Sequence, residues 1–180
     1  MKLKNLSFTV ILATLFQFSA YAEIDYGRLN PGYFELLINQ AAFIGEQEFI
    51  RDKAFEKSAP IHDQMLELEE SPIKDSQQEV KLSELYQSIR VQGQIIRTSE
   101  EHIKRSERIL EDHPSTSEYQ EHPYFSFIKK AGLQYGALLK KKRESSKQSD
   151  QTTLDEEISK IEKHISSAID LFEVEYDINN

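Results

Sequence analysis

The chain has 180 residues, carries a net charge of −9 at pH 7 and contains no cysteine. The lack of cysteine excludes disulfides, thiolate metal sites and a cysteine nucleophile, and the negative charge disfavours a nucleic-acid binder because it would repel phosphate. No stretch reaches the roughly 18 apolar residues of a membrane-spanning helix, which predicts a protein without a transmembrane anchor.

Residues 1–22 are typical of a secretory signal peptide. Lys2 and Lys4 precede an apolar stretch from Leu6 to Phe18, and Ala20-Tyr21-Ala22 supplies the small residues that a signal peptidase requires. The alternative, a buried N-terminal helix of the folded domain, would need polar residues at helical spacing, and this stretch offers few of them. We therefore predict a cleaved signal peptide at 1–22 and a single helical domain at 23–180.

Export would leave a mature chain of 158 residues. Its net charge would be −11, because the segment removed carries only the two lysines. This length suffices for a stable core without disulfides, since a domain of about 150 residues buries roughly 68–70% of its unfolded surface. Export without disulfide chemistry favours the bacterial periplasm, with extracellular release as the alternative.

The first predicted helix covers residues 33–57. Apolar residues occupy nearly its whole circumference through Ile44, which is typical of a centrally buried helix. Pro60 is expected to break or kink the helix before a short continuation that ends in Glu69-Glu70.

The second predicted helix covers residues 76–111 and opens with a capping box, Ser76-x-x-Glu79. Apolar residues follow the heptad spacing of a coiled coil, but polar or small residues interrupt them, so no tight two-stranded zipper is expected. The helix would extend about 54 Å. We therefore expect part of it to protrude or to bend, most readily at Gly93.

Two further helices are predicted at residues 123–145 and 153–176. Pro123 opens the first, and Thr153-x-x-Glu156 caps the second, which carries the clearest apolar stripe of the chain. A polar turn at residues 146–151 joins them. With no β-hairpin signal in the sequence, these patterns predict an all-α fold, an antiparallel bundle of about four long helices.

Motifs of catalysis and of cofactor binding are missing from the sequence. No histidine forms the Glu-x-x-His pattern of helical di-iron sites, and there is neither a Gly-x-Ser-x-Gly elbow nor a glycine-rich phosphate loop. We therefore expect a protein that is not an enzyme and holds no cofactor.

The remaining metal candidates are His113 and His122, which lie in the repeated triplets Asp112-His113-Pro114 and Glu121-His122-Pro123. Extended backbone before each proline would let the two imidazoles and nearby carboxylates converge on a cation. The simpler interpretation is that proline ends one helix at the first triplet and begins another at the second. Two histidines without a third ligand rarely define a metal site.

Charged residues gather in three segments. The basic segment Lys140-Lys141-Lys142-Arg143 is better explained by the dipole at a helix C-terminus than by contact with an anionic lipid or an acidic partner. Two acidic segments are candidates for partner binding, and the second interleaves apolar residues with its carboxylates. They comprise Glu67, Glu69 and Glu70, then Phe172, Glu173, Glu175, Tyr176 and Asp177. Such a surface suits docking onto a basic protein, although a solvated, frayed terminus is the commoner reason for the second pattern.

These patterns predict an exported, non-enzymatic helical protein that binds another protein in the bacterial periplasm. An inhibitor or immunity-type protein, whose glutamates mimic an anionic ligand of a basic cleft, is the first hypothesis. A chaperone-like or structural envelope protein that acts through the long helix at residues 76–111 is the second. A small helical metal-binding protein that uses His113 and His122 is the third.

Overall fold

The computed structural model describes residues 31–71 and 75–179, with side chains through Glu175, so the predicted signal peptide lies outside the described residues. Within these residues the chain forms five helices and no strand. In chain order they are α2 (Pro31–Glu70), α3 (Ser76–Glu111), α4 (Pro114–Tyr119), α5 (Pro123–Glu144) and α6 (Gln148–Asn179). The all-α prediction is confirmed for this part of the chain. It contains four long helices and a short one, α4, which lies between α3 and α5 and was not predicted.

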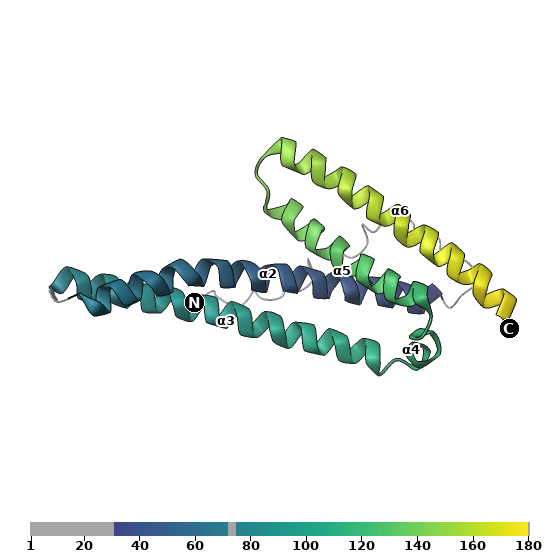
Figure 1. Cartoon of the computed structure of the whole chain (residues 1–180), viewed down its shortest axis with the longest axis horizontal. Coiled ribbons are helices and arrows are strands. Elements are labelled where there is room, and N and C mark those ends of the chain that lie inside the picture. The colour runs from purple at the N-terminus through teal and green to yellow at the C-terminus, as the bar shows by residue number, and fades with distance from the viewer. Residues whose placement is uncertain (1–30, 72–74, 180) are drawn as a thin grey trace, which may run out of the picture.

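The long helices form two hairpins that lie against each other. α2 and α3 pack side by side in opposite directions, and α5 and α6 form a second hairpin that is inclined to the first (Figure 1). α2 contacts both α3 and α5, whereas α6 packs against α5. α2 is therefore the central helix, which explains why apolar residues surround so much of its circumference.

Small residues let α2 and α5 approach each other closely. A Cβ atom added to Gly132 would lie 2.7 Å from the Cβ of Ala41, and one added to Gly136 would lie 2.7 Å from the Cα of Ala42 and closer still to its carbonyl group. Gly45 meets the backbone of α5 in the same way. The two helix backbones are thus in contact where a larger residue would hold them apart.

α2 and α5 run in the same direction. Gly132 lies beside Ala41, and further along both helices Glu144 pairs with Lys53. In a square antiparallel bundle, neighbouring helices run in opposite directions and two parallel helices face each other across a diagonal. Here the parallel pair are direct neighbours, so the expected bundle is replaced by helices packed in the order α3, α2, α5, α6.

Pro60 does not break α2, and the helical continuation that was expected to end at Glu69-Glu70 is present. The helix continues without interruption to Glu70. Proline has no N–H for the carbonyl four residues earlier, which here belongs to Glu56. Both residues are exposed and line an open groove, where water can bind the freed carbonyl.

The bounds predicted for the helix at residues 76–111 agree with α3, which is continuous through Gly93. Its cap differs from the prediction. Asp75, rather than Ser76, precedes the helix, and its carboxylate accepts hydrogen bonds from the N–H groups of Gln77 and Gln78 at 2.9 and 2.8 Å. A carboxylate at this position also interacts favourably with the helix dipole.

α6 begins at Gln148, which is earlier than the expected cap at Thr153. The Thr153 hydroxyl donates to the carbonyl of Ser149 inside the helix, and the polar segment predicted as a turn supplies most of the first turn of α6. The Gln151 amide closes the connection by donating to the carbonyl of Ser145 at 2.8 Å.

Aromatic rings from several helices meet near α4, the short helix that connects α3 to α5 at one end of the molecule in Figure 1. Phe34 of α2, Tyr119 of α4 and Phe172 of α6 contact one another with ring centroids 5.4 to 5.8 Å apart. Such pairs add about 0.5–1.5 kcal/mol each to the stability that burial provides. This cluster anchors both hairpins to each other.

Tyr33 packs against Phe34 and Tyr119 of the cluster and also belongs to a buried chain of hydrogen bonds. Its hydroxyl lies 2.8 Å from the hydroxyl of Thr116, which in turn donates to the carbonyl of Leu110. Because Thr116 donates its only proton to that carbonyl, Tyr33 acts as the donor to Thr116. Burial raises the pKa of Tyr33 above 10.0.

We predict that Tyr33→Phe lowers the free energy of unfolding by about 1 kcal/mol at pH 7, because it removes one buried hydrogen bond. In the wild type, the stability linked to the raised pKa is fully present below pH 10 and is lost as the pH rises through the pKa of the folded state. The variant should lose less stability than the wild type between pH 9 and pH 11. Urea unfolding at several pH values measures both effects, and parallel pH curves for the two proteins would contradict the second.

Candidate protein-binding surface

α2 and α3 continue as a hairpin beyond the last residues of α5 and project away from the other helices (Figure 1). We call residues 56–70 and 75–92 the hairpin end. It carries eight acidic and three basic side chains, a net charge of −5 with histidine neutral, and all eleven are exposed. The acidic residues are Glu56, Asp63, Glu67, Glu69, Glu70, Asp75, Glu79 and Glu84. With Lys74, which lies between the two ranges in the sequence, residues 56–92 have a net charge of −4.

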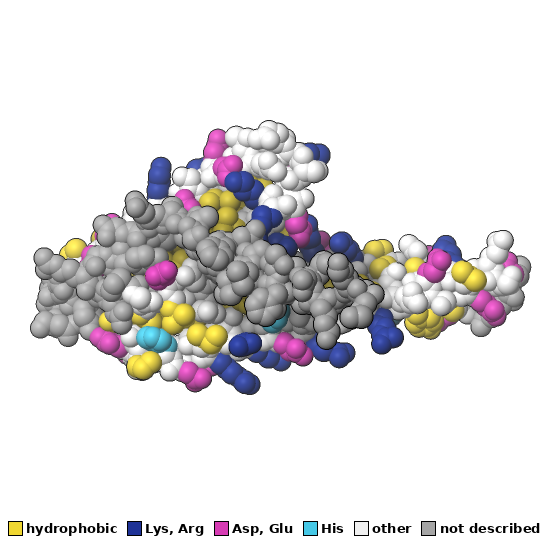
Figure 2. Space-filling model, turned by 180° about the vertical axis from the view of Figure 1, so that it is seen from behind, with side chains coloured by type: hydrophobic (Ala, Val, Ile, Leu, Met, Phe, Trp, Pro, Cys, Tyr) yellow, Lys and Arg dark blue, Asp and Glu magenta, His cyan; other side chains and the backbone are white. Residues whose placement is uncertain are grey.

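Apolar side chains lie exposed among these carboxylates. Leu66, Val80, Tyr86 and Val91 are between 45% and 60% exposed, and Phe55 lies exposed just before them on α2. Figure 2 shows hydrophobic side chains beside acidic ones on the projecting end. Single exposed apolar residues are ordinary, but several on one projection are typical of an interaction surface.

The first predicted acidic segment lies in the last turns of α2, where the hairpin turns. Glu67, Glu69 and Glu70 are exposed. Glu69 also accepts a hydrogen bond of 2.5 Å from the hydroxyl of Tyr86 on α3. This bond and the negative charge of Glu69 raise the pKa of Tyr86. The bond joins the two helices at the end of the hairpin.

A shallow groove follows one side of the hairpin between α2 and α3. Its outer part has a volume of about 820 Å³ and its inner part about 320 Å³, and Val91 lines both. The apolar residues that line the two parts are Ile50, Pro60, Ile61, Val91 and Ile95. Charged residues border the outer part, namely Glu56, Lys57 and Glu84.

The second predicted acidic segment lies at the end of α6, and its first residue is part of the core. The Phe172 side chain is fully buried and packs on Phe34 and Tyr119, so it is not available to a partner on the surface. Glu173 is half-buried, and Glu175 is exposed, with its carboxylate 3.5 Å from Nε2 of His122. The side chains of Tyr176 and Asp177 lie outside the described part of the structure.

His113 and His122 each cap a helix. The Nδ1 atom of His113 accepts the N–H of Ser115 at 3.2 Å, and Nδ1 of His122 accepts the N–H of Tyr124 at 3.4 Å. Each is followed by a proline in the first helical turn, of α4 and α5 respectively. Both acidic-His-Pro triplets therefore begin a helix, whereas the sequence suggested that the first only ends one.

The two imidazole rings also pack against the aromatic core. The ring of His113 lies 4.7 Å from that of Tyr33, and the ring of His122 lies 4.2 Å from that of Phe172. Within the described residues, no three His, Cys, Asp or Glu side chains are grouped so that they could hold a metal ion. Each Nδ1 is engaged as a cap, and Nε2 of His122 lies beside the Glu175 carboxylate, so the two rings do not converge on a shared ligand.

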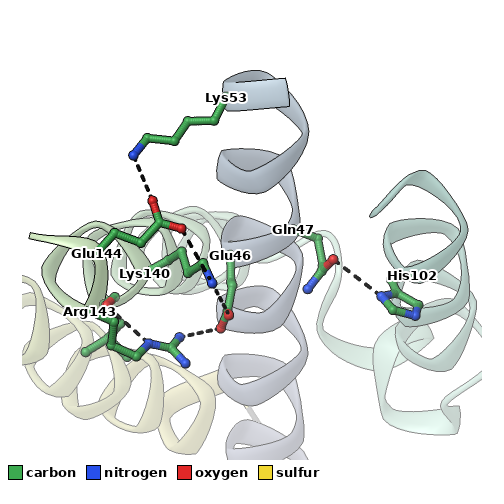
Figure 3. A network of polar contacts seen from close by, with 8 residues as sticks. Glu46, Gln47, Lys53, His102, Lys140, Arg143 and Glu144 are labelled. Atoms are coloured by element: carbon green, nitrogen blue, oxygen red, sulfur yellow. Dashed lines mark hydrogen bonds and ion pairs between the residues drawn. The ribbon is translucent and has the colours of Figure 1, made fainter. Parts of the chain in front are cut away.

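The predicted basic segment pairs with acidic residues of the same fold. Arg143 lies 2.5 Å and Lys140 3.8 Å from the carboxylate of Glu46 on α2 (Figure 3). Lys142 pairs with Asp155 of α6. These cations form ion pairs between α5 and its two neighbours, α2 and α6. The sequence had suggested only an interaction with the helix dipole or with an external anionic or acidic partner.

Glu144 completes this network at the end of α5. It accepts a hydrogen bond of 2.7 Å from Lys53 of α2, and Lys140 lies 3.6 Å away (Figure 3). The bond from Lys53 is the main reason why the pKa of Glu144 lies below its usual 4.5. On the other side of α2, Gln47 and His102 of α3 lie 3.3 Å apart, side-chain oxygen to ring nitrogen.

The apolar residues of the hairpin end were not identified from the sequence. Val80, Tyr86 and Val91 do not occupy the heptad positions of the helix predicted at residues 76–111. The heptad pattern therefore places them on its solvent-facing side. What could have identified them is that they are large apolar residues outside the heptad positions of a helix of which part was expected to protrude.

No family model, no curated protein and no solved structure matches this chain. Among the helices that the structure describes, none has the length and apolar character needed to cross a bilayer. The described residues form a helical protein with a projecting acidic hairpin.

Proposed function

We propose that this chain is an exported, non-enzymatic protein that binds another protein in the bacterial periplasm, as an inhibitor or immunity-type protein, through its hairpin end. One observation carries the proposal: a projection with a net charge of −5 and several exposed apolar side chains extends beyond the packed helices. The carboxylates would steer the hairpin end toward a basic partner. The apolar side chains would supply the desolvated contacts that hold it there.

Inhibition would follow from the shape and charge of this projection. A two-helix hairpin is narrow enough to enter a cleft, and Glu67, Glu69 and Glu70 at its turn would occupy the position of an anionic ligand. The leader-like residues 1–22 support export, and the mature chain would then be strongly acidic, with a net charge of −11. Such a protein would act by occlusion and would need no reactive group of its own.

We predict that the triple variant Glu67→Gln, Glu69→Gln and Glu70→Gln captures its partner from periplasmic extract about tenfold less strongly than the wild type, because each exposed carboxylate contributes roughly 0.2–1 kcal/mol. The matched control changes Glu101, Glu107 and Glu111 to Gln. These residues are equally exposed on α3 but lie outside the hairpin end. Titrating the immobilised chain against extract and quantifying the captured protein by mass spectrometry measures the difference.

The two variants separate a local contact from a general effect of charge. Equal losses in both would mean that overall charge, rather than the hairpin end, attracts the partner. If the wild type captures no partner in a fixed ratio, the proposed function itself is wrong.

The exposed apolar residues favour a chaperone-like role as the second candidate function. Phe55, Leu66 and Val80 would bind unfolded segments of many clients. Light scattering of insulin treated with a reductant tests this role, because the chain has no cysteine and is unaffected by the reductant. Suppressed aggregation of insulin and of an unrelated heated protein would favour the chaperone over the inhibitor.

A further inference from the structure

We infer that the groove between α2 and α3 binds a basic amphipathic helix of the partner protein, which packs as a third helix against the hairpin. The inference rests on the proposed function and adds the chemistry of the partner to it. The groove passes along the projecting hairpin, and Val91 lines both of its parts.

The length of the groove fits a helix of about four turns. On α2 its lining residues extend from Gln47 to Ile61, and on α3 they extend from Glu84 to Ser99. At about 1.5 Å per residue each side is about 21–23 Å long, which matches a helix of about 15 residues.

The lining of the groove fits the apolar stripe of such a helix. Ile50 and Ile61 lie on one side, and Val91 and Ile95 lie one turn apart on the other. A helix with apolar residues at positions i, i+3, i+4 and i+7 would place its stripe along both rows. Val91 is the main anchor, because it lines both parts of the groove and is 53% exposed.

Charge selects a basic occupant. Glu56 and Glu84 border the groove on opposite sides, Lys57 also borders it, and the hairpin end around these residues has a net charge of −5. Lysines or arginines on the outer face of the bound helix would complement these carboxylates. A second copy of this chain would bring an equally acidic hairpin to the groove, and an anionic membrane would repel it in the same way.

The test uses three synthetic peptides of about 18 residues. The first contains leucine at helical i, i+3, i+4 and i+7 spacing with lysine elsewhere, the second has the same composition in scrambled order, and the third has glutamate in place of lysine. Fluorescence anisotropy with labelled peptides measures their binding to the full chain. We expect the first peptide to bind at least tenfold more tightly than either of the others.

Val91→Arg should weaken binding of the first peptide at least tenfold, because the arginine fills the groove and repels the lysines. Val174→Arg is the matched control, since Val174 is an equally exposed valine on α6 and the change in charge is the same. Circular dichroism and thermal unfolding of both variants establish that they fold.

Several outcomes would overturn the inference. These are equal binding of the scrambled peptide, equal effects of the two valine variants, or a wild-type dimer that Val91→Arg dissociates in sedimentation velocity experiments. If Val91→Arg still captures the periplasmic partner while the triple glutamine variant does not, the groove inference is wrong and the proposed function stands. If the wild type captures no partner at all, the proposed function fails whatever the peptides do.

Discussion

Gly136→Ala is expected to lower the free energy of unfolding by about 3 kcal/mol, at the upper end of what overpacking usually costs. The added methyl group would meet the backbone of Ala42, which lies in the central helix and cannot rotate away as a side chain would. α2 and α5 would have to separate, and the contacts around the crossing would loosen together. The better helix propensity of alanine offsets only about 1 kcal/mol.

Gly93→Ala is the matched control for this substitution. It makes the same chemical change within a helix, but nothing lies within 4 Å of the added methyl group. We therefore expect it to stabilise the protein by about 0.5–1 kcal/mol. Urea unfolding monitored by circular dichroism measures both variants. The close packing of α2 on α5 would be contradicted if both glycine variants were more stable than the wild type.

Phe172→Ala is expected to lower the free energy of unfolding by about 3–5 kcal/mol, the usual cost of removing a buried aromatic ring. The ring is fully buried and contacts Phe34, Tyr119 and His122 from three other parts of the fold. Its loss would leave a cavity between the two hairpins. Denaturant unfolding of the variant measures the loss directly.

Leu171→Ala provides the comparison for Phe172→Ala, because Leu171 is the next residue along the chain and its side chain is 49% exposed. We expect a loss below about 1 kcal/mol for this variant. Similar losses at the two positions would show that Phe172 is not a core residue. In that case Phe172 would again be a candidate residue for binding a partner, as its sequence pattern predicts.

The sequence predicted the starts of α3 and α5 well, but not the start of α6, which lies five residues before the expected cap. Ser76 and Pro123 were predicted to open α3 and α5, since capping residues and prolines act through local backbone geometry, although Asp75 is the residue that caps α3. At Pro60 the break does not occur, and both the proline and Glu56, whose carbonyl the proline leaves without its usual helical partner, are exposed beside the groove. Solvent exposure of that kind depends on neighbouring helices and is not a local property.

The arrangement of the helices was harder to predict. An apolar stripe indicates that one face of a helix is buried, but it does not indicate which helix packs against that face. The parallel contact of α2 with α5 was therefore not predicted. A signal for it was nevertheless present. Gly132-x-x-x-Gly136 and Ala41-x-x-x-Gly45 place small residues one turn apart on each helix, which permits the two backbones to touch.

The candidate surface was predicted in part. Glu67, Glu69 and Glu70 were identified by their charge alone, but their position at the turn of a projecting hairpin required the structure. The groove was not foreseen, because its residues come from α2 and α3 and none of them forms a continuous motif. Phe172 was predicted to lie on the surface because carboxylates follow it in the sequence, but its side chain is buried in the core.

Hydrogen exchange of the full chain, alone and with the partner captured from periplasmic extract, tests the central claim most directly. The claim is that the protein acts by presenting the hairpin end to another protein. We expect binding to slow exchange in residues 56–70 and 75–92, while α5 and α6 exchange as in the free protein. Protection confined to α5 and α6, with none in the hairpin end, would contradict it.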